Sequence, residues 1–296
     1  MIVRSSLAVS ALGRRKSSGV RGRLLRLIDR LGRMALSPIE LIGMAVMLLA
    51  RMAEFIALAP FARHPFAFHW LMLGRDLADL LMGPALRVVA LSVVLGVTVS
   101  LVLESFASGL LSQTGTANLV IVATVQQIPP FVASGVLAAR GALPLSIRLA
   151  EMVDRGQIDS MAIMGVDLVM LHAVPRCLAV ILASMVHALL AMTVFGLTTG
   201  LTLSWLGIVP TETFFGALRL LPVFEKLGLI GLQLLSASVL VVAVAVVQGI
   251  QDSGDERVDL AQVSVVCILK AATVVLVVNA SFALTRLPEL PVLVWR

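Results

Sequence analysis

Long apolar runs separated by short polar segments dominate the chain after residue 83. Five of these runs are close to the length of about 20 residues that a helix needs to cross a bilayer. They occupy residues 88–111, 117–139, 177–201, 229–250 and 263–284. The pattern predicts an all-α integral membrane protein in which five transmembrane helices follow amphipathic or interfacial helices near the N-terminus.

The first 36 residues follow a different pattern, in which leucines and arginines alternate. Leu24, Leu27, Ile28 and Leu31 recur at roughly helical spacing. Nine of the 23 basic residues lie here, namely Arg4, Arg14, Arg15, Lys16, Arg21, Arg23, Arg26, Arg30 and Arg33. This pattern is typical of a basic amphipathic helix on an anionic membrane surface and indicates a cytoplasmic N-terminus. A solvated basic tail is the alternative.

Residues 37–82 form a third type of segment. The apolar run 39–60 contains Glu40, Arg51 and Glu54. Because a charge near the bilayer centre costs roughly 2.5–3.5 kcal/mol, three charges favour an interfacial helix, bounded by Pro38 and Pro60, over a span. A polar connection over 63–79 and a new element at residues 83–84 are predicted to follow. The expected organisation is 1–36, 37–82 and a membrane domain over 83–296.

Loop charges indicate how the predicted spans are oriented. The loop 140–176 carries Arg140, Arg148, Arg155 and Arg176, whereas the turn 113–116 has no basic residue. Basic loops stay on the cytoplasmic side, so 140–176 is predicted to be cytoplasmic. The outer segment 202–228 is rich in aromatic residues and is expected to form a helix at the outer interface.

Composition restricts the class of function. The chain is 59% hydrophobic and 14% charged, and its mean hydropathy is +1.03. These values exclude a soluble domain. The net charge of +6 does not indicate nucleic-acid binding, because it is concentrated at one end of the chain. The sequence contains no GxxxxGK[ST], GxSxG or HExxH motif. We therefore predict no catalytic residue, metal site or cofactor in this chain, and any ATP with its Mg²⁺ would be bound by another subunit.

The loop 140–176 has the pattern of an amphipathic helix over residues 147–164. Leu149 and Met152 alternate with charged residues, and Gly165 lies where a helix C-cap glycine belongs. The acids Glu151, Asp154 and Asp159 are expected to face the cytosol or a partner protein while the apolar side rests on the spans. This predicts a cytoplasmic helix between the second and third spans.

The second predicted span is interrupted halfway by Gln126, Gln127, Pro129 and Pro130. Two prolines remove two backbone donors, and a membrane helix tolerates this only where the freed carbonyls face protein or water. The break is expected to line a cavity or, alternatively, to be a kink in a packing helix. Glu104 in the first span is expected to face a cavity or a neighbouring helix, or to lie as an acid at the interface.

Four other side chains within the spans favour structural roles. His187 is expected to be a hydrogen-bonded packing residue, and Lys270 is expected to extend its ammonium toward the cytoplasmic head groups. Cys177 and Cys267 belong to no CxxC or Cys/His pattern and are expected to pack as small hydrophobic residues.

Taken in order, these segments resemble the permease subunit of Mce-type lipid ABC transporters, the MlaE/YrbE family, over about residues 80–290. The loop QIDSMAIMGVD is similar to the family pattern EQIDALxxMGVDP at Gln157, Ile158, Asp159, Met164, Gly165, Val166 and Asp167. The segment QQIPPFVASGVLAARG resembles the family pattern RELGPVxxxLLxAGRxG, which matches Pro130, Arg140 and Gly141. The segment LVLESF resembles the family pattern LxLQxY, which would place Glu104 and Phe106 near a lipid cavity. The chain departs from the family at the Gln126–Gln127 pair, at Gly156 and at Leu168.

The resemblance implies a multi-pass protein of the bacterial cytoplasmic membrane that works with three kinds of partner. These are an ABC ATPase subunit docked on the loop helix, a periplasmic Mce-domain protein, and a second permease copy or paralogue that completes a dimer around membrane lipid. The residues expected to couple to the ATPase are Glu151, Asp154, Gln157, Asp159, Met164, Gly165 and Asp167. The residues expected along the lipid path are Glu104, Phe106, Gln126, Gln127 and Pro130. The alternative function is a membrane scaffold that holds a cytosolic partner without transport.

Overall fold

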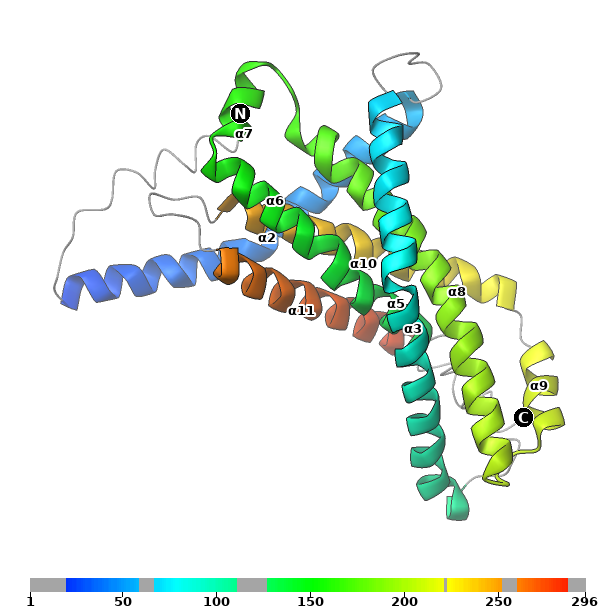
Figure 1. Ribbon diagram of the computed structural model, residues 1–296. Coiled ribbons are helices and arrows are strands. Elements are labelled where there is room, and N and C mark those ends of the chain that lie inside the picture. Colours follow the sequence, from blue (N-terminus) through cyan, green and yellow to red (C-terminus); the bar gives the residue numbers. More distant parts are fainter. Residues whose placement is uncertain (1–19, 59–66, 111–126, 221–222, 252–259, 287–296) are drawn as a thin grey trace. The chain divides into compact units, whose positions relative to one another are not determined.

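The computed structural model of the protein describes residues 20–58, 67–110, 127–220, 223–251 and 260–286. These residues form helices and turns, and five helices are long and apolar enough to cross a membrane (Figure 1). The chain divides into two compact units, residues 1–43 and 44–296. The predicted all-α architecture with five spanning helices is therefore confirmed.

The first helix of the described chain, α2, runs without a break from Val20 to Leu58. The expected boundary at Pro38 is wrong, because this proline lies inside the helix. A proline removes one backbone hydrogen bond, which a helix of 39 residues can lose without ending. In the second unit α2 buries one stripe, Ala45, Leu48, Met52 and Phe55, whose spacing of three and four residues is that of one helix face.

Helix α3, Ala67–Leu110, also continues through a predicted boundary. Residues 67–79 are helical rather than a polar connection, and the helix does not restart at Pro84. At about 1.5 Å per residue its 44 residues span about 66 Å, so even a tilted α3 extends beyond a hydrocarbon core of about 30 Å.

A stripe of small residues, Ser92, Gly96 and Ser100, lets α3 lie close to a partner helix. α3 packs along α8, Val174–Trp205, with both helices running in the same direction (Figure 1). The Ser100 Oγ lies 3.4 Å from the Thr199 carbonyl oxygen, and a Cβ on Gly96 would lie 3.0 Å from that of Thr198. Small residues at every fourth position allow such an approach of two backbones in a membrane.

The second spanning element ends later than the sequence predicts. α5 (Ile128–Leu137), the π-helical segment η2 (Ala138–Ala142) and α6 (Leu143–Asp154) form one apolar stretch of 27 residues. The prediction that a loop begins at residue 140 is therefore wrong.

The buried face of α6 gives the reason. α6 buries Leu145, Ser146, Leu149 and Met152, and it packs against α10 and α11. At Gly249 the α10 backbone comes so close that a Cβ would lie 2.8 Å from the Ser146 carbonyl oxygen. The charged residues that suggested a loop lie on the other faces, since Arg148 is exposed and Arg140 is half-buried.

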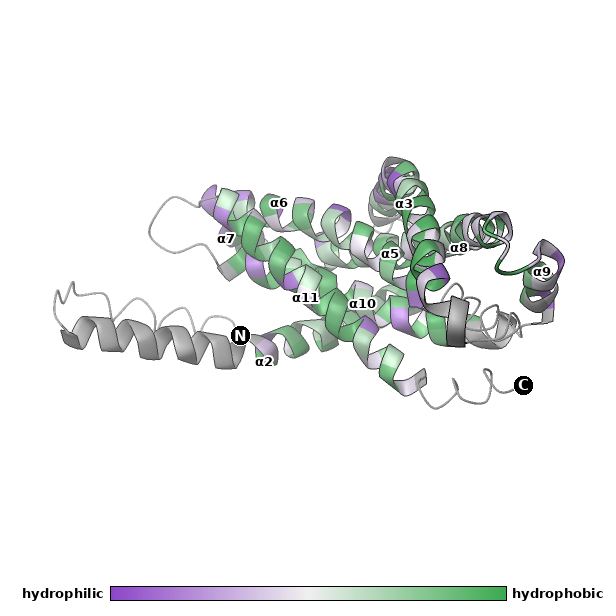
Figure 2. Ribbon diagram, turned by 90° about the horizontal axis from the view of Figure 1, so that it is seen from below, coloured by the Kyte–Doolittle hydropathy of each residue, from purple (hydrophilic) through white to green (hydrophobic). Residues whose placement is uncertain are grey.

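After α6 come a short helix α7 (Gln157–Ile163), a second π-helical segment η3 (Val169–Ala173), and then α8. The last helices are α9 (Thr211–Leu220), α10 (Val223–Gln251) and α11 (Leu260–Arg286). Of the spanning stretches, α10 is the most buried. In its apolar window 67% of the residues are buried, against 28% in α11 and 22% in α3. Helix α10 is thus central, and α3 and α11 present apolar surface outward. Figure 2 shows hydrophilic residues at α9 and near α7.

Helix α9 packs against the C-terminal end of α8. Phe214 of α9 packs against Gly200, where a Cβ would lie 2.6 Å from the ring, and it is buried with Leu203 and Val209. The Phe214 and Phe215 rings meet edge to face with centroids 5.3 Å apart. The predicted helix between the third and fourth spans is confirmed.

Candidate functional site

Two glycines in the left-handed conformation divide the polar segment between α6 and α8. Gly156 has φ +66°, and its N–H donates to the Val153 carbonyl oxygen at 2.9 Å, which ends α6. The predicted single helix over 147–164 is therefore two helices. Glycine adopts this conformation at low cost because it has no Cβ. Gly156, which departs from the family pattern, therefore separates α6 from α7.

The second glycine ends α7, as its position predicted. Gly165 has φ +74° and donates to the Ala162 carbonyl oxygen at 3.2 Å, while Val166 donates to the Met161 carbonyl oxygen at 2.9 Å. This pair of bonds is the Schellman arrangement of a helix C-terminus. The prediction of a C-cap glycine at position 165 is confirmed.

No residue of α7 is buried. Asp154, Gln157 and Asp159 are exposed, as expected, whereas Glu151 is half-buried and lies 3.9 Å from Arg155. The most exposed apolar side chains of this segment are Ile163 at 84% and Met164 at 69%, and the neighbouring Val166 is exposed as well. Met164 was among the predicted site residues and Ile163 was not, although the place of Ile163 two residues before a glycine in a polar segment was a usable signal.

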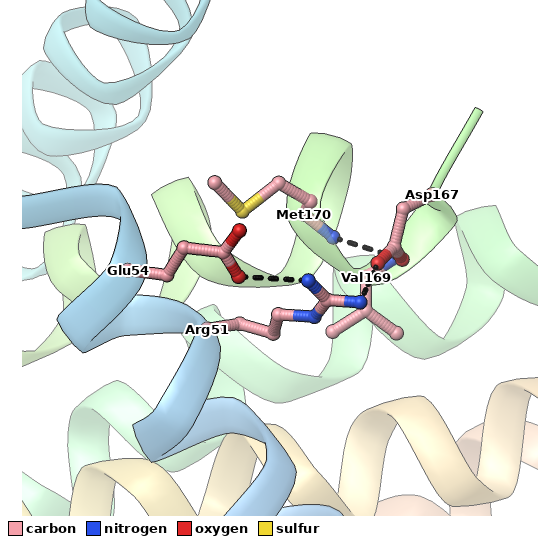
Figure 3. A network of polar contacts seen from close by, with 5 residues as sticks. All are labelled: Arg51, Glu54, Asp167, Val169 and Met170. Atoms are coloured by element: carbon pink, nitrogen blue, oxygen red, sulfur yellow. Dashed lines mark hydrogen bonds and ion pairs between the residues drawn. The ribbon is translucent and has the colours of Figure 1, made fainter. Parts of the chain in front are cut away.

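Asp167 follows this turn and uses both carboxylate oxygens within the chain (Figure 3). Its Oδ1 accepts from the backbone N–H of Val169 at 2.9 Å and of Met170 at 3.4 Å, which caps the start of η3. Its Oδ2 lies 2.9 Å from Nη2 of Arg51 on α2, and Nη1 of Arg51 lies 2.7 Å from Glu54 Oε2. The hydrogen bond to Glu54, and after it the negative charge of Asp167, raises the pKa of the Arg51 guanidinium above its usual value.

A buried arginine holds the other side of the segment. Arg176 is 7% exposed, and its Nη1 lies 3.1 Å from Asp76 Oδ1 on α3. Its Nη2 donates to the Arg140 carbonyl oxygen at 2.8 Å and its Nε to that of Gly141 at 3.4 Å, both in η2. A Cβ on Gly141 would lie 2.7 Å from Val180 Cγ2, so glycine is needed for this close approach. Arg176 was predicted to be a loop charge, yet its guanidinium joins α3, η2 and α8.

A second buried polar cluster joins three helices in the apolar core. The Gln233 side-chain amide on α10 donates to Asn279 Oδ1 on α11 at 2.7 Å. The Asn279 amide donates to Ser134 Oγ on α5 at 3.2 Å and to the Val275 carbonyl oxygen at 2.7 Å. Inside a membrane such amides need protein partners, so this cluster specifies how α5, α10 and α11 pack.

His187 and Lys270, two further polar side chains of the spans, each have a hydrogen-bond partner in the protein. His187 is buried, with Nδ1 2.7 Å from the Ala183 carbonyl oxygen, so the predicted packing histidine is confirmed. Lys270 donates to Gln248 Oε1 on α10 at 2.7 Å, so the prediction that it extends to the head groups is wrong. Cys177 and Cys267 are free and buried. Within the described ranges, no three His, Cys, Asp or Glu residues are grouped so that they could hold a metal ion.

A comparison with protein families identifies the class of this fold. Residues 73–285, from α3 to α11, match the model of the family described as Permease MlaE. The chain belongs to the MlaE permease family. No curated protein matches the chain. Membership indicates the multi-pass permease of a lipid ABC transporter, a transport subunit rather than an enzyme.

In this MlaE permease the described lipid-path residues lie near the end of α3 and at the start of α5. Glu104 is exposed near the end of α3, Gln127 is half-buried and Pro130 is buried. Gln126 and the side chain of Phe106 lie outside the described residues. Pro130 is in the first turn of α5, where a missing N–H leaves no hydrogen bond unmade. No ion pair or hydrogen bond between described residues links Glu104 to Gln127 or Pro130.

The core of the MlaE permease contains a recess between α5, α8 and α10. Ser134, Val180 and Ser238 are among its lining residues, and it is too narrow to hold a water molecule. A lipid therefore does not fit into this recess of the single chain.

Proposed function

We propose that this chain is the permease subunit of an ATP-driven transporter that moves lipid between the bacterial cytoplasmic membrane and a periplasmic Mce-domain protein. The observation that carries the proposal beyond family membership is α7, a short helix with no buried residue, held between two glycine turns. In this proposal α7 is where an ABC ATPase subunit docks.

The surface of α7 and its turn suits a protein partner. Ile163, Met164 and Val166 form an exposed apolar tip, and Asp154 and Asp159 are exposed beside it. An apolar centre with a polar rim is the usual composition of a protein interface, where the centre carries most of the binding energy. We therefore expect Ile163 and Met164 to dominate the docking, with Asp154, Gln157 and Asp159 at its rim.

The elements on either side of α7 are connected so that a movement of α7 passes to the spanning helices. α6 continues into η2 and α5 without a loop, and α7 leads through η3 into α8. Arg176 joins these two connections through hydrogen bonds to the carbonyl oxygens of Arg140 and Gly141. A displacement of α7 by ATP binding in the partner would thus move packed helices. ATP and Mg²⁺ belong to the partner in this proposal, and the permease performs no covalent chemistry.

A lipid path would require a second permease, either a copy of this chain or a paralogue. The recess between α5, α8 and α10 is too narrow for a lipid, while α3 and α11 expose apolar surface. We propose that two permeases enclose the path between them and that the Mce-domain protein covers its outer end. Glu104 and Gln127 remain our candidates for contact with the lipid.

The proposal can be tested by purifying the chain with its native partners. An ATPase and an Mce-domain protein should accompany it, and the complex should transfer lipid when ATP is supplied. The double substitution Ile163→Asp with Met164→Asp should remove the ATPase. Thr213→Asp, an exposed position of α9 at the opposite end of α8, is the matched control and should retain it.

Two outcomes would contradict the proposal. If the double variant retained the ATPase, α7 would not be the docking helix. If the wild-type chain brought a cytosolic partner but no Mce protein and no lipid transfer, the non-transporting scaffold would be the better function.

A further inference from the structure

The ion pair between Arg51 and Asp167 connects two elements that are far apart in sequence. Arg51 lies on the part of α2 that belongs to the second unit, and Asp167 lies at the start of η3, two residues after the Gly165 turn. The two side chains are 39% and 36% exposed, so the contact lies at the edge of the helix core. Figure 3 shows the Arg51 guanidinium between Glu54 on its own helix and Asp167 on the other segment.

Asp167 has the geometry of a positioning residue. Its Oδ1 accepts from the N–H groups of Val169 and Met170, which fixes the side chain against the start of η3. Its other carboxylate oxygen, Oδ2, lies 2.9 Å from Arg51 Nη2. A carboxylate with both oxygens occupied in this way has little capacity left for a partner protein.

We propose that the Arg51–Asp167 ion pair fixes the position of the α7 turn relative to α2, so that movement of α7 is passed to α2 as well as to α8. The inference rests on the proposed docking of an ATPase at α7. It changes the expected role of Asp167, which acts through Arg51 and the backbone of η3 rather than by touching the ATPase. Arg51 becomes part of the coupling machinery although it lies outside the segment between α6 and α8.

The Arg51 site offers a matched pair of variants. Asp167→Asn keeps an amide oxygen for the two backbone N–H groups but places an NH₂ group, which cannot accept a hydrogen bond, toward Arg51. Glu54→Gln neutralises the other carboxylate of the same guanidinium and leaves the contact between α2 and η3 in place. Both variants remove one negative charge within the same cluster, and only Asp167→Asn separates the two elements.

The first measurement is transport in the complete complex with its native partners. Asp167→Asn should retain the ATPase on purification, but lipid transferred per ATP hydrolysed should fall at least about fivefold, the lower end of typical coupling between sites. Glu54→Gln should resemble the wild type. Arg51→Gln should reproduce the loss and Arg51→Lys should restore part of it, because lysine keeps the charge without the fork of donors.

The second measurement is the distance between the two elements. Spin labels can be attached at Ala50→Cys on α2 and Ala162→Cys on α7, both exposed, because Cys177 and Cys267 are buried and poorly accessible to the label. The distance distribution should broaden with Asp167→Asn and stay unchanged with Glu54→Gln.

Three outcomes would overturn the inference. Loss of the ATPase from the Asp167→Asn complex would make Asp167 a direct contact of the partner. Equal effects of Asp167→Asn and Glu54→Gln on the transfer ratio would mean that the cluster acts only through its surface charge. An unchanged transfer ratio in Arg51→Gln would mean that α2 takes no part in coupling. A wild-type complex without ATPase would instead contradict the proposed function, so the two failures are distinguishable.

Discussion

Two arginines form ion pairs beside the α7 segment, one with a buried guanidinium and the other with an exposed one. Arg176 is buried and its guanidinium has three partners, in α3 and η2. Arg51 is 39% exposed and joins Asp167 to Glu54. A buried guanidinium that loses its partners cannot turn to water, whereas an exposed one can.

Burial, more than charge, decides what an ion pair does in this protein. The Arg176 contact is part of the folded core, so breaking it should mainly lower the free energy of unfolding. The Arg51 contact lies at the surface, so breaking it should change the position of a segment and leave the fold intact. The variants below test this difference, beginning with the largest expected effect.

Arg176→Met should destabilise the protein most. It would leave the Asp76 carboxylate and the carbonyl oxygens of Arg140 and Gly141 without their donor. Removal of one partner of a buried pair costs about 3–5 kcal/mol, and we expect the lower end because the Asp76 side chain remains 32% exposed. The check is the unfolding midpoint of the purified protein in detergent, with Arg51→Gln as the exposed counterpart. Equal midpoints for the two variants would refute the comparison.

Gly249→Ala should have the next largest effect, because it forces apart two backbones in the core. The new Cβ would lie 2.8 Å from the Ser146 carbonyl oxygen, and overpacking of this kind costs about 1–3 kcal/mol. The gain of about 1 kcal/mol in helix propensity offsets only part of that cost.

Gly231→Ala is the control on the same helix, since its Cβ would lie 3.5 Å from the flexible end of Met185. It should leave the unfolding midpoint unchanged or raise it. A Gly249→Ala variant as stable as Gly231→Ala would mean that α6 does not pack on α10 in the way described.

Asn279→Leu should have a moderate effect, because its cluster is buried but carries no formal charge. It would remove the contacts to Gln233 and Ser134, each worth about 0.6 kcal/mol by comparison with other membrane proteins. The same unfolding assay should place it between Arg176→Met and the surface variants. A loss as large as that of Arg176→Met would show that burial of any polar group, charged or neutral, dominates stability here.

Asp167→Asn should have the smallest effect on stability, although we expect it to change transport. The cap of η3 persists and the exposed Arg51 regains water, so the unfolding midpoint should match that of Glu54→Gln. A clear drop in the midpoint would place the Arg51 contact in the same class as that of Arg176.

The sequence was sufficient to predict the class of fold and most of the spans. Apolar runs reveal α8, α10 and α11 directly, because these helices must bury or expose apolar surface along their whole length. Gly165 was predictable for a local reason, since a glycine after a helical pattern usually ends the helix.

The errors arose where tertiary packing decides the outcome. Pro38 suggested a boundary, but it lies inside α2. Pro84 and the polar residues of 67–79 suggested others, but α3 continues through them as it packs along α8. Arg140 and Arg176 read as loop charges because a sequence pattern does not show that one guanidinium can satisfy two carbonyl oxygens and a carboxylate. Of the site, the exposed acids were predictable, whereas the link from Asp167 to Arg51 depends on folding over more than 100 residues of chain.

The π-helical segment η2 adds a constraint of a different kind. Hydrogen bonds in η2 span five residues in place of four, so this turn holds one residue more than an α-helical turn. Each residue of a helix rotates the chain by about 100°, and a chain one residue shorter in η2 would turn the buried stripe of α6 away from α10 by that angle. The phase of α6 is therefore set by a count of residues upstream, and no substitution within α6 can compensate for a change in that count.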